Sequence, residues 1–317
     1  MRIARGLTRV TQPTALTIGN FDGVHRGHQM LLRLVGERAE EAGLLPAVLT
    51  FEPHPRERLA PASAPPRLTP LRDKARLIAS EGIAHLHILP FRRTTAYLSA
   101  AAFIEMVLVR TLSVRHLVIG DDFRFGSHRS GSLETLLSAG EVFGFTVEAL
   151  PAICEGEKRI SSSAVRAALL AGQMRHAAQL LGRWFAISGR VRRGAQLGRT
   201  LGVPTLNLKL PPRLIAPRGV FVGWVEGIAD QPQRAVINIG TRPTLGSDTT
   251  PTLEAHLLDW QGEGYGTAVT VYLADRLRNE QRFPSLLALT EQIHADIAQA
   301  RHWHDAHPHA FQEFVHG

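Results

Sequence analysis

Two different hydrophobic patterns follow one another along this chain of 317 residues, and they meet near residues 181–183. Before that point, short apolar runs alternate with longer segments in which apolar residues recur every three or four positions. After it, short apolar runs follow one another directly, separated by turns rich in glycine and proline. The first spacing indicates helices that bury one face, and short apolar runs indicate strands. The sequence therefore predicts two domains, residues 1–183 and residues 184–317.

The first domain is predicted to be α/β with a parallel sheet. Its strand-like runs are residues 14–18, 46–51, 85–90, 115–120 and 145–150. Its helix-like segments are residues 28–43, 69–82, 99–112, 132–143 and 161–172. This alternation is typical of a Rossmann-like, doubly wound sheet. Such sheets bind ligands beyond the carboxyl ends of their strands.

The second domain is predicted to be a small antiparallel β-barrel with a terminal helix. Strand-like runs without helices between them favour a barrel. They are residues 185–191, 203–208, 219–225, 235–239, 253–258 and 268–273. A helical segment follows at residues 285–301. The histidines beyond it, His302, His304, His307 and His309, lack the frame of a metal site and are expected to lie in a solvated terminus.

Composition excludes several classes of protein. The apolar fraction of 44% and the charged fraction of 20% are those of a folded globular chain and not of a disordered one. A single cysteine, Cys154, excludes an internal disulfide framework. No apolar run is long enough for a membrane span, and the first residues contain no signal-peptide core. We therefore expect a cytoplasmic protein with no membrane partner.

The net charge of +8 is concentrated in the first domain. Residues 1–183 hold 23 basic and 16 acidic residues, whereas residues 184–317 hold 13 and 12. Phosphorylated small molecules or a nucleic acid would both suit such a surplus. A nucleic-acid-binding protein predicts a continuous basic stripe or an RNA-binding fingerprint, and neither occurs. We therefore expect small-molecule substrates and no nucleic acid.

The first expected strand runs directly into the motif GNFDGVHRGH, which ends in a His-x-Gly-His pattern. The turn from a strand into a helix offers backbone N–H groups and a helix dipole to an anion. Gly19, Gly23 and Gly27 allow the backbone to approach a phosphate chain closely. His25 and His28 can donate hydrogen bonds to charge on a transferring phosphoryl group. The alternative, a turn with two surface histidines, does not explain the strand-turn-helix setting.

Three further polar motifs follow expected strands, at residues 50–55, 120–126 and 159–166. They would bring aromatic, acidic, hydroxyl and arginine side chains to one edge of the sheet. Serines with Arg166 suit a triphosphate, while Phe51 and Phe123 suit a flat ring system. Taken singly, each phenylalanine could be a core residue, and Ser161 could be only a helix cap.

In the second domain, spaced glycines with arginine and threonine over residues 189–208 can shape an anion-binding loop. The loop is not a Walker loop, because Gly-Lys-Ser/Thr is missing. A glycine-rich barrel hairpin is the alternative. Further on, Glu254 and His256 share a strand face, opposite Leu253 and Leu257. A carboxylate there can act as a general base toward a hydroxyl, or it can be an ordinary solvent-facing glutamate.

These motifs resemble those of one family. Residues 14–183 resemble the nucleotidyltransferase module of bacterial bifunctional riboflavin kinase/FAD synthetases, and residues 184–300 resemble the flavokinase module. The resemblance implies transfer of AMP from ATP to the phosphate of FMN, giving FAD and pyrophosphate, in the first domain. It implies phosphorylation of riboflavin by ATP in the second, with Mg²⁺ as cofactor. A chain that retains only FMN adenylyltransferase activity is the alternative, and a monomer or weak homo-oligomer is expected.

The resemblance also implies roles for individual residues. In the first domain His25 and His28 stabilise charge at the α-phosphate, and Asn20 and Asp22 lie near the triphosphate and metal. The ATP and phosphate site comprises Gly19, Asn20, Phe21, Asp22, Gly23, Gly27, Ser161, Ser162, Ser163 and Arg166. The flavin site comprises Phe51, His54, Asp122 and Phe123.

In the second domain the resemblance implies Glu254 as the base, with Thr205 and Asn207 holding Mg²⁺ and phosphates. The full set for ATP and phosphate is Gly189, Gly194, Gly198, Arg199, Thr205 and Asn207. Two positions depart from the family pattern. Gly264 stands where leucine is usual, and Leu245 stands where phenylalanine is more common.

Overall fold

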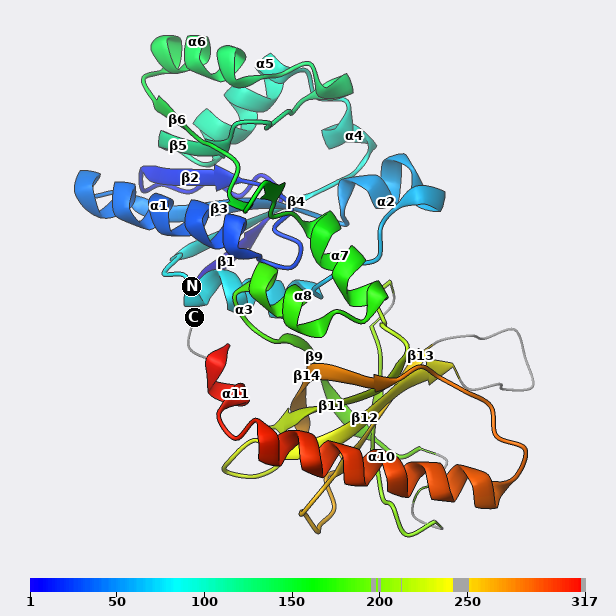
Figure 1. Cartoon of the computed structure of the whole chain (residues 1–317). Coiled ribbons are helices and arrows are strands. Elements are labelled where there is room, and N and C mark those ends of the chain that lie inside the picture. The colour runs from blue at the N-terminus through cyan, green and yellow to red at the C-terminus, as the bar shows by residue number, and fades with distance from the viewer. Residues whose placement is uncertain (195–197, 199–200, 212, 242–250, 315–317) are drawn as a thin grey trace. The chain divides into compact units, whose positions relative to one another are not determined.

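The computed structural model describes residues 1–194, 198, 201–211, 213–241 and 251–314. It divides into two compact units, Met1–Ser161 and Ser162–Gly317. This division precedes the boundary expected at residue 183, because two helices, α7 (Ser162–Ala171) and α8 (Met174–Leu181), belong with the second unit. Each unit has its own sheet (Figure 1).

The first unit is built on a six-stranded sheet in the order β1-β4-β3-β2-β5-β6, in which every pair of neighbours is parallel. The prediction of a doubly wound sheet is confirmed. The strands are β1 (Arg2–Arg5), β2 (Thr14–Ile18), β3 (Leu45–Glu52), β4 (His85–Pro90), β5 (Val114–Gly120) and β6 (Thr146–Leu150). The sequence did not predict β1, a short and largely exposed edge strand.

Helices cover both faces of this sheet because its strands alternate their buried side chains between two cores. On one face lie α1 (Arg26–Ala42) and α3 (Leu71–Ser80). On the other lie α5 (Ala100–Phe103), the π-helical segment Ile104–Thr111 that continues it, and α6 (Leu133–Phe143). The short elements are α2 (Pro55–Leu59), α4 (Arg93–Ala96), two 3₁₀ turns (Pro61–Ser63 and Ser127–Arg129) and the hairpin of β7 (Cys154–Glu155) with β8 (Lys158–Arg159).

The second unit is a closed antiparallel barrel in the order β10-β13-β12-β11-β14-β9 (Figure 1). The predicted barrel is therefore confirmed. Its strands are β9 (Phe185–Arg192), β10 (Leu206–Lys209), β11 (Gly219–Glu226), β12 (Gln233–Thr241), β13 (Pro251–Leu257) and β14 (Ala268–Arg278). The strand expected from residue 203 begins only at Leu206, because residues 203–205 are irregular and pair with no strand.

The terminal helix α10 (Leu286–Ala306) lies against β11, β12 and β14, and α11 (Ala310–Glu313) follows it. An aromatic cluster lies between these helices and the barrel, in which the ring of Trp224 contacts those of Trp184, Trp303 and Phe311. The expectation of a solvated terminus is wrong for His304, which is 2% exposed and packs edge-on against Trp224. The helix continues beyond its expected end, and this carries His304 onto the barrel.

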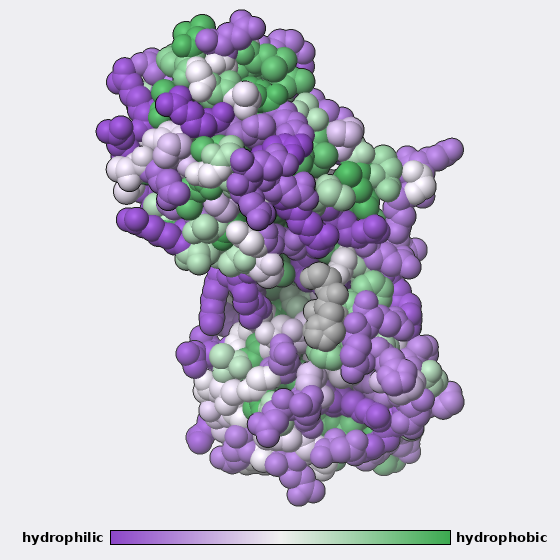
Figure 2. Space-filling view, turned by 90° about the vertical axis from the view of Figure 1, so that its left-hand side faces the viewer, coloured by the Kyte–Doolittle hydropathy of each residue, from purple (hydrophilic) through white to green (hydrophobic). Residues whose placement is uncertain are grey.

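Hydrophilic residues cover most of the face drawn in Figure 2, and hydrophobic residues appear there in smaller groups. Among the described residues, no helix combines the length and the hydropathy that crossing a membrane would need.

Candidate active sites

The turn between β2 and α1 holds the backbone in an uncommon conformation. Phe21 has a φ of 47°, Gly23 of 86° and Val24 of 41°. Each non-glycine residue in such a region costs roughly 1–3 kcal/mol, and surrounding packing must compensate. The side chains of Phe21 and Val24 do this, because both are fully buried in the core beneath α1. Phe21 is thus an anchor of the turn, and its predicted contact with ATP stays a prediction.

His25 and His28 lie together at the N-terminus of α1. His25 is the N-cap, and its Nδ1 accepts a hydrogen bond from the backbone N–H of His28 at 3.4 Å. The two rings stack, with 3.7 Å between their centroids. A Cβ atom on Gly27 would lie 3.3 Å from the His25 ring, and one on Gly19 would lie 3.0 Å from Phe21. These two glycines therefore make room for rings, besides any approach to phosphate.

Asp22 and Asn20 differ in exposure although they are near neighbours. Asn20 is exposed, whereas Asp22 is buried at 4% exposure. The Asp22 carboxylate accepts hydrogen bonds from the backbone N–H of Leu68 at 3.0 Å and of Thr69 at 3.1 Å. The structure thus gives Asp22 a role in fixing the turn, which the sequence did not reveal. Its place near a metal stays a prediction.

The expected flavin residues lie at the ends of β3 and β5, the two strands that flank β2 in the sheet: Phe51 within β3, His54 after it, and Asp122 and Phe123 after β5. Phe51 and Phe123 are half-buried and both pack against the same core cluster. His54 is the N-cap of α2, and its Nδ1 accepts from the backbone N–H of Arg56. The structure therefore brings these residues to the carboxyl edge of the sheet, beside the histidine turn. The two aromatic rings therefore pack against the core and are also partly exposed at this edge of the sheet.

Asp122, the fourth expected flavin residue, forms an exposed ion pair with Arg159 at 2.8 Å. The hydrogen bond from this guanidinium holds the pKa of Asp122 below its usual range. Ser161 ends the first unit, while Ser162, Ser163 and Arg166 stand in the first turns of α7 in the second unit. Whether these four residues reach the triphosphate stays a prediction.

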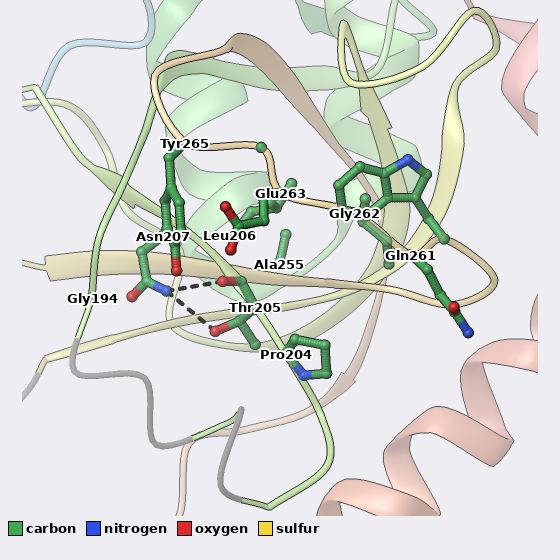
Figure 3. Close-up of a pocket in the computed structure, with 13 residues that line it drawn as sticks. Gly194, Pro204, Thr205, Leu206, Asn207, Ala255, Gln261, Gly262, Glu263 and Tyr265 are labelled. Atoms are coloured by element: carbon green, nitrogen blue, oxygen red, sulfur yellow. Dashed lines mark hydrogen bonds between the residues drawn. The ribbon is translucent and has the colours of Figure 1, made fainter.

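In the barrel, two residues expected to act in riboflavin phosphorylation, Asn207 and Glu254, lie on neighbouring strands. Asn207 on β10 pairs with Glu254 on β13, and Glu254 pairs in turn with Asn238 on β12. Paired residues of antiparallel strands project their side chains from the same face of the sheet. The Asn207 amide also donates to the carbonyl and the hydroxyl oxygens of Thr205, each at 3.2 Å (Figure 3).

A cavity of about 230 Å³ opens beside Thr205 and Asn207 (Figure 3). Three of its lining residues, Gly194, Thr205 and Asn207, are predicted site residues, whereas the wall that follows β13 was not predicted as part of the site. That wall comprises Trp260, Gln261, Gly262, Glu263, Gly264 and Tyr265. The departure of Gly264 from the family pattern was the one signal of it. A leucine side chain there would collide with Ile228, because even a Cβ would lie 2.5 Å from its Cδ1.

The expected glycines of the barrel are closely packed. A Cβ atom on Gly194 would lie 2.2 Å from Oδ1 of Asn207, and one on Gly198 would lie 2.3 Å from the carbonyl oxygen of Val203. Gly189 packs against Leu208. Gly194 thus keeps space beside Asn207 in which only hydrogen fits. Arg199 lies outside the described residues.

The oxygen donors near this cavity suit Mg²⁺. Thr205 supplies a hydroxyl and Asn207 an amide oxygen, and Mg²⁺ prefers such hard ligands together with water and substrate phosphates. Within the described ranges, no group of three or more His, Cys, Asp or Glu side chains forms a metal site by itself. Substrate phosphates would therefore have to complete the coordination of the ion.

Comparisons with known proteins identify the family of the chain. The family model of FAD synthetase matches residues 7–164, and that of riboflavin kinase matches residues 181–304. The bifunctional riboflavin kinase/FMN adenylyltransferase of Escherichia coli K12 is 44% identical over 95% of this chain and 97% of its own. The chain belongs to this family. The predicted family and its two activities are confirmed, with FAD synthetase first and riboflavin kinase second in the chain.

Other family members and one solved structure extend the match. The bifunctional enzyme of Pseudomonas fluorescens is 45% identical over 95% of this chain and 97% of its own. A solved structure from Streptococcus pneumoniae, described as a macrolide-efflux protein, is 30% identical and covers 96% of this chain and 100% of its own. Its TM-score of 0.83 shows that the two chains share a fold over nearly their whole length.

Proposed function

We propose that the first unit joins FMN to AMP at the turn between β2 and α1. His25 and His28 donate hydrogen bonds to the charge that develops around the α-phosphate of ATP. The phosphate of FMN attacks that phosphorus in line, the new P–O bond forms, and pyrophosphate leaves. No protein nucleophile is needed, so catalysis is positioning and electrostatics. The stacked histidines at the N-terminus of a helix support this assignment.

The remaining residues of this unit bind rather than react. The flavin ring lies near Phe51 and Phe123, with His54 and Asp122 beside it. The backbone of the turn binds the triphosphate. A grip on phosphates by Ser161, Ser162, Ser163 and Arg166 stays a prediction, because three of these residues belong to the second unit.

In the second unit, Glu254 accepts the proton of the ribityl hydroxyl of riboflavin as the hydroxyl oxygen attacks the γ-phosphate of ATP. The bond from the γ-phosphorus to ADP breaks, and FMN is formed. The observation that carries this proposal is the pairing of Glu254 with Asn207, which lines the cavity. It puts a carboxylate next to residues that can hold phosphates.

Mg²⁺ would be held by Thr205 and Asn207 together with the nucleotide. When bound, the ion neutralises charge on the phosphates of ATP. The chain's own residues orient the hydroxyl and remove its proton. The donor chemistry of the two side chains supports this choice of metal.

Incubation with riboflavin, ATP and Mg²⁺, with FMN, FAD, ADP and pyrophosphate resolved over time, tests the proposal. We expect FMN to rise first and FAD to follow, with ADP and pyrophosphate formed in step. Absence of FMN would refute the kinase assignment, and FMN without FAD would refute the transferase assignment. The intact Thr205, Asn207 and Glu254 oppose a chain that retains only the transferase activity.

Three further expectations stay predictions. They are a cytoplasmic location, the absence of nucleic-acid and membrane partners, and a monomer or weak homo-oligomer. Salt-sensitive RNA binding without flavin turnover would contradict the second of these.

A further inference from the structure

Residues 67–74, which we call the clamp segment, tie together two loops at the carboxyl edge of the first sheet. Arg67 at its start donates to Glu57 at 2.6 Å and to Glu52 at 2.8 Å. These bonds hold the loop that follows β3. Thr69 accepts at its hydroxyl oxygen from the backbone N–H of Gly23 at 3.2 Å, and the backbone of residues 68 and 69 holds Asp22. The segment therefore fixes the turn between β2 and α1, which carries His25 and His28.

Lys74, at the end of the clamp segment, lies in the first turn of α3 and is 5% exposed. Its Nζ donates to the carbonyl oxygen of Asn20 at 2.7 Å. Thr50 offers a longer contact to the same carbonyl, at 3.4 Å. The other two lysines of the chain, Lys158 and Lys209, are exposed, as is usual for this residue.

A buried ammonium group is costly to the fold. Burial lowers the pKa of Lys74, and the nearby carboxylates of Asp22 and Glu52 act in the opposite direction. An apolar side chain of similar length would fill the same space without this desolvation, and such replacements of buried ions are often neutral or stabilising. Packing of α3 alone therefore gives no reason for a cation at this position. The short hydrogen bond from Lys74 to the Asn20 carbonyl indicates that the role of this cation lies at the turn.

We infer that Lys74 is a positioning residue for adenylyl transfer, which fixes the Asn20 carbonyl and so sets the turn that receives the α-phosphate. The inference rests on the proposed function of the first unit. Asn20 is exposed at the mouth of the turn, and its peptide leads into the strained Phe21. Holding the carbonyl inward directs the following backbone N–H groups and the Asn20 side chain.

The experiment compares Lys74→Met, Lys74→Arg and the control Arg72→Met, which removes an exposed cation from the same helix. For each full-length variant, kcat and KM are measured for FAD formation from supplied FMN. Riboflavin phosphorylation by the same preparation reports on the second unit. Circular dichroism and thermal melting report on folding.

We expect Lys74→Met to lower kcat for FAD formation by about 10²-fold with KM for FMN changed less than about threefold, as for a misplaced reacting group. Lys74→Arg is expected to recover about tenfold of that loss and not the whole of it, because it restores a cation and a donor whose longer fork still displaces the Asn20 carbonyl. Arg72→Met and the kinase activity should match the wild type. Folded Lys74→Met with wild-type kcat, or a loss confined to KM, would overturn the inference.

Two further outcomes, misfolding of Lys74→Met and absence of FAD formation by the wild-type chain, are interpreted separately. If Lys74→Met fails to fold, Lys74→Arg decides: its longer fork displaces the Asn20 carbonyl, so an unchanged kcat in that variant would also overturn the inference. If the wild-type chain makes no FAD from FMN, the proposed function of the first unit fails instead.

Discussion

Asn207 on β10 stands directly opposite Glu254 on β13, and the two residues face the same side of the barrel wall. The amide of Asn207 is tied to Thr205, so the predicted phosphate ligands and the predicted base form one continuous group. Riboflavin kinase chemistry needs these elements together, because a hydroxyl must lose its proton while it attacks a phosphate.

Replacing Glu254 by Gln is expected to lower FMN formation from riboflavin by about 10²–10⁴-fold, the usual contribution of a general base. FAD formation from supplied FMN should persist, because the first unit is unaffected. The assay follows both products by chromatography. Glu226→Gln is the control, since this carboxylate lies at the end of β11 and accepts from Tyr272. Loss of both activities in Glu254→Gln would contradict two separate sites.

Gly194→Ala is expected to reduce FMN formation by about 10²-fold while FAD formation from FMN persists. The new methyl group would lie 2.2 Å from Oδ1 of Asn207, so that side chain must move. Gly36→Ala is the matched control, because this helical glycine has open space around its Cβ position. That control should stabilise the fold by about 0.5–1 kcal/mol. Wild-type FMN formation in Gly194→Ala would show that Asn207 has no part in the reaction.

His25 has two roles that substitution can separate. As the N-cap of α1 it accepts from a backbone N–H, and asparagine is a good N-cap residue that can take over this bond. His25→Asn should therefore melt like the wild type, yet lose about 10²–10³-fold in FAD formation because a donor to the α-phosphate is gone. His25→Ala should lose activity and also about 0.5–2 kcal/mol of stability. An active His25→Asn would assign the residue to the cap alone.

His304 makes the stability of the second unit depend on pH. Burial lowers its pKa from the usual 6.5 to about 4, and the Arg234 charge acts in the same direction. The unfolded chain then binds more protons than the folded one between these two values, so stability falls as pH drops from about 6.5 to about 4. His304→Gln should flatten this dependence by roughly 3 kcal/mol. Urea unfolding of both chains at pH 7 and pH 4.5 measures it, and exposed His302→Gln should change nothing.

The sequence predicted the fold class of both units and most of their strands and helices for physical reasons. The periodicity of apolar residues indicated the strands and helices. The residue types of the motif that ends in His28 indicated a phosphate-binding turn. The sequence could not show that Phe21 and Val24 hold the turn through buried side chains at positive φ, because neither residue favours that conformation. Only the surrounding core makes it stable.

The sequence also could not predict which residues of distant strands pair with each other. The register that sets Asn207 against Glu254 depends on closure of the whole barrel, and alternation alone gives the face but not the partner. Nothing in the sequence distinguishes Lys74 from a surface lysine, because its burial and its bond to the Asn20 carbonyl depend on how α3 packs against the turn. Helix α8 was missed because Gly172, at a φ of 76°, ends α7 so abruptly that the pattern is interrupted.

The most direct test of two separate sites mixes two full-length variants, each with a different active site inactivated. His28→Ala should convert riboflavin to FMN and stop there, while Glu254→Gln should make FAD only from supplied FMN. Mixed in one tube with riboflavin, ATP and Mg²⁺, the two full-length variants should restore FAD formation, because FMN released by one is the substrate of the other. No FAD from the mixture, with each variant retaining its single activity, would contradict exchange of free FMN. Loss of both activities in either variant would contradict the account of two independent active sites in one chain.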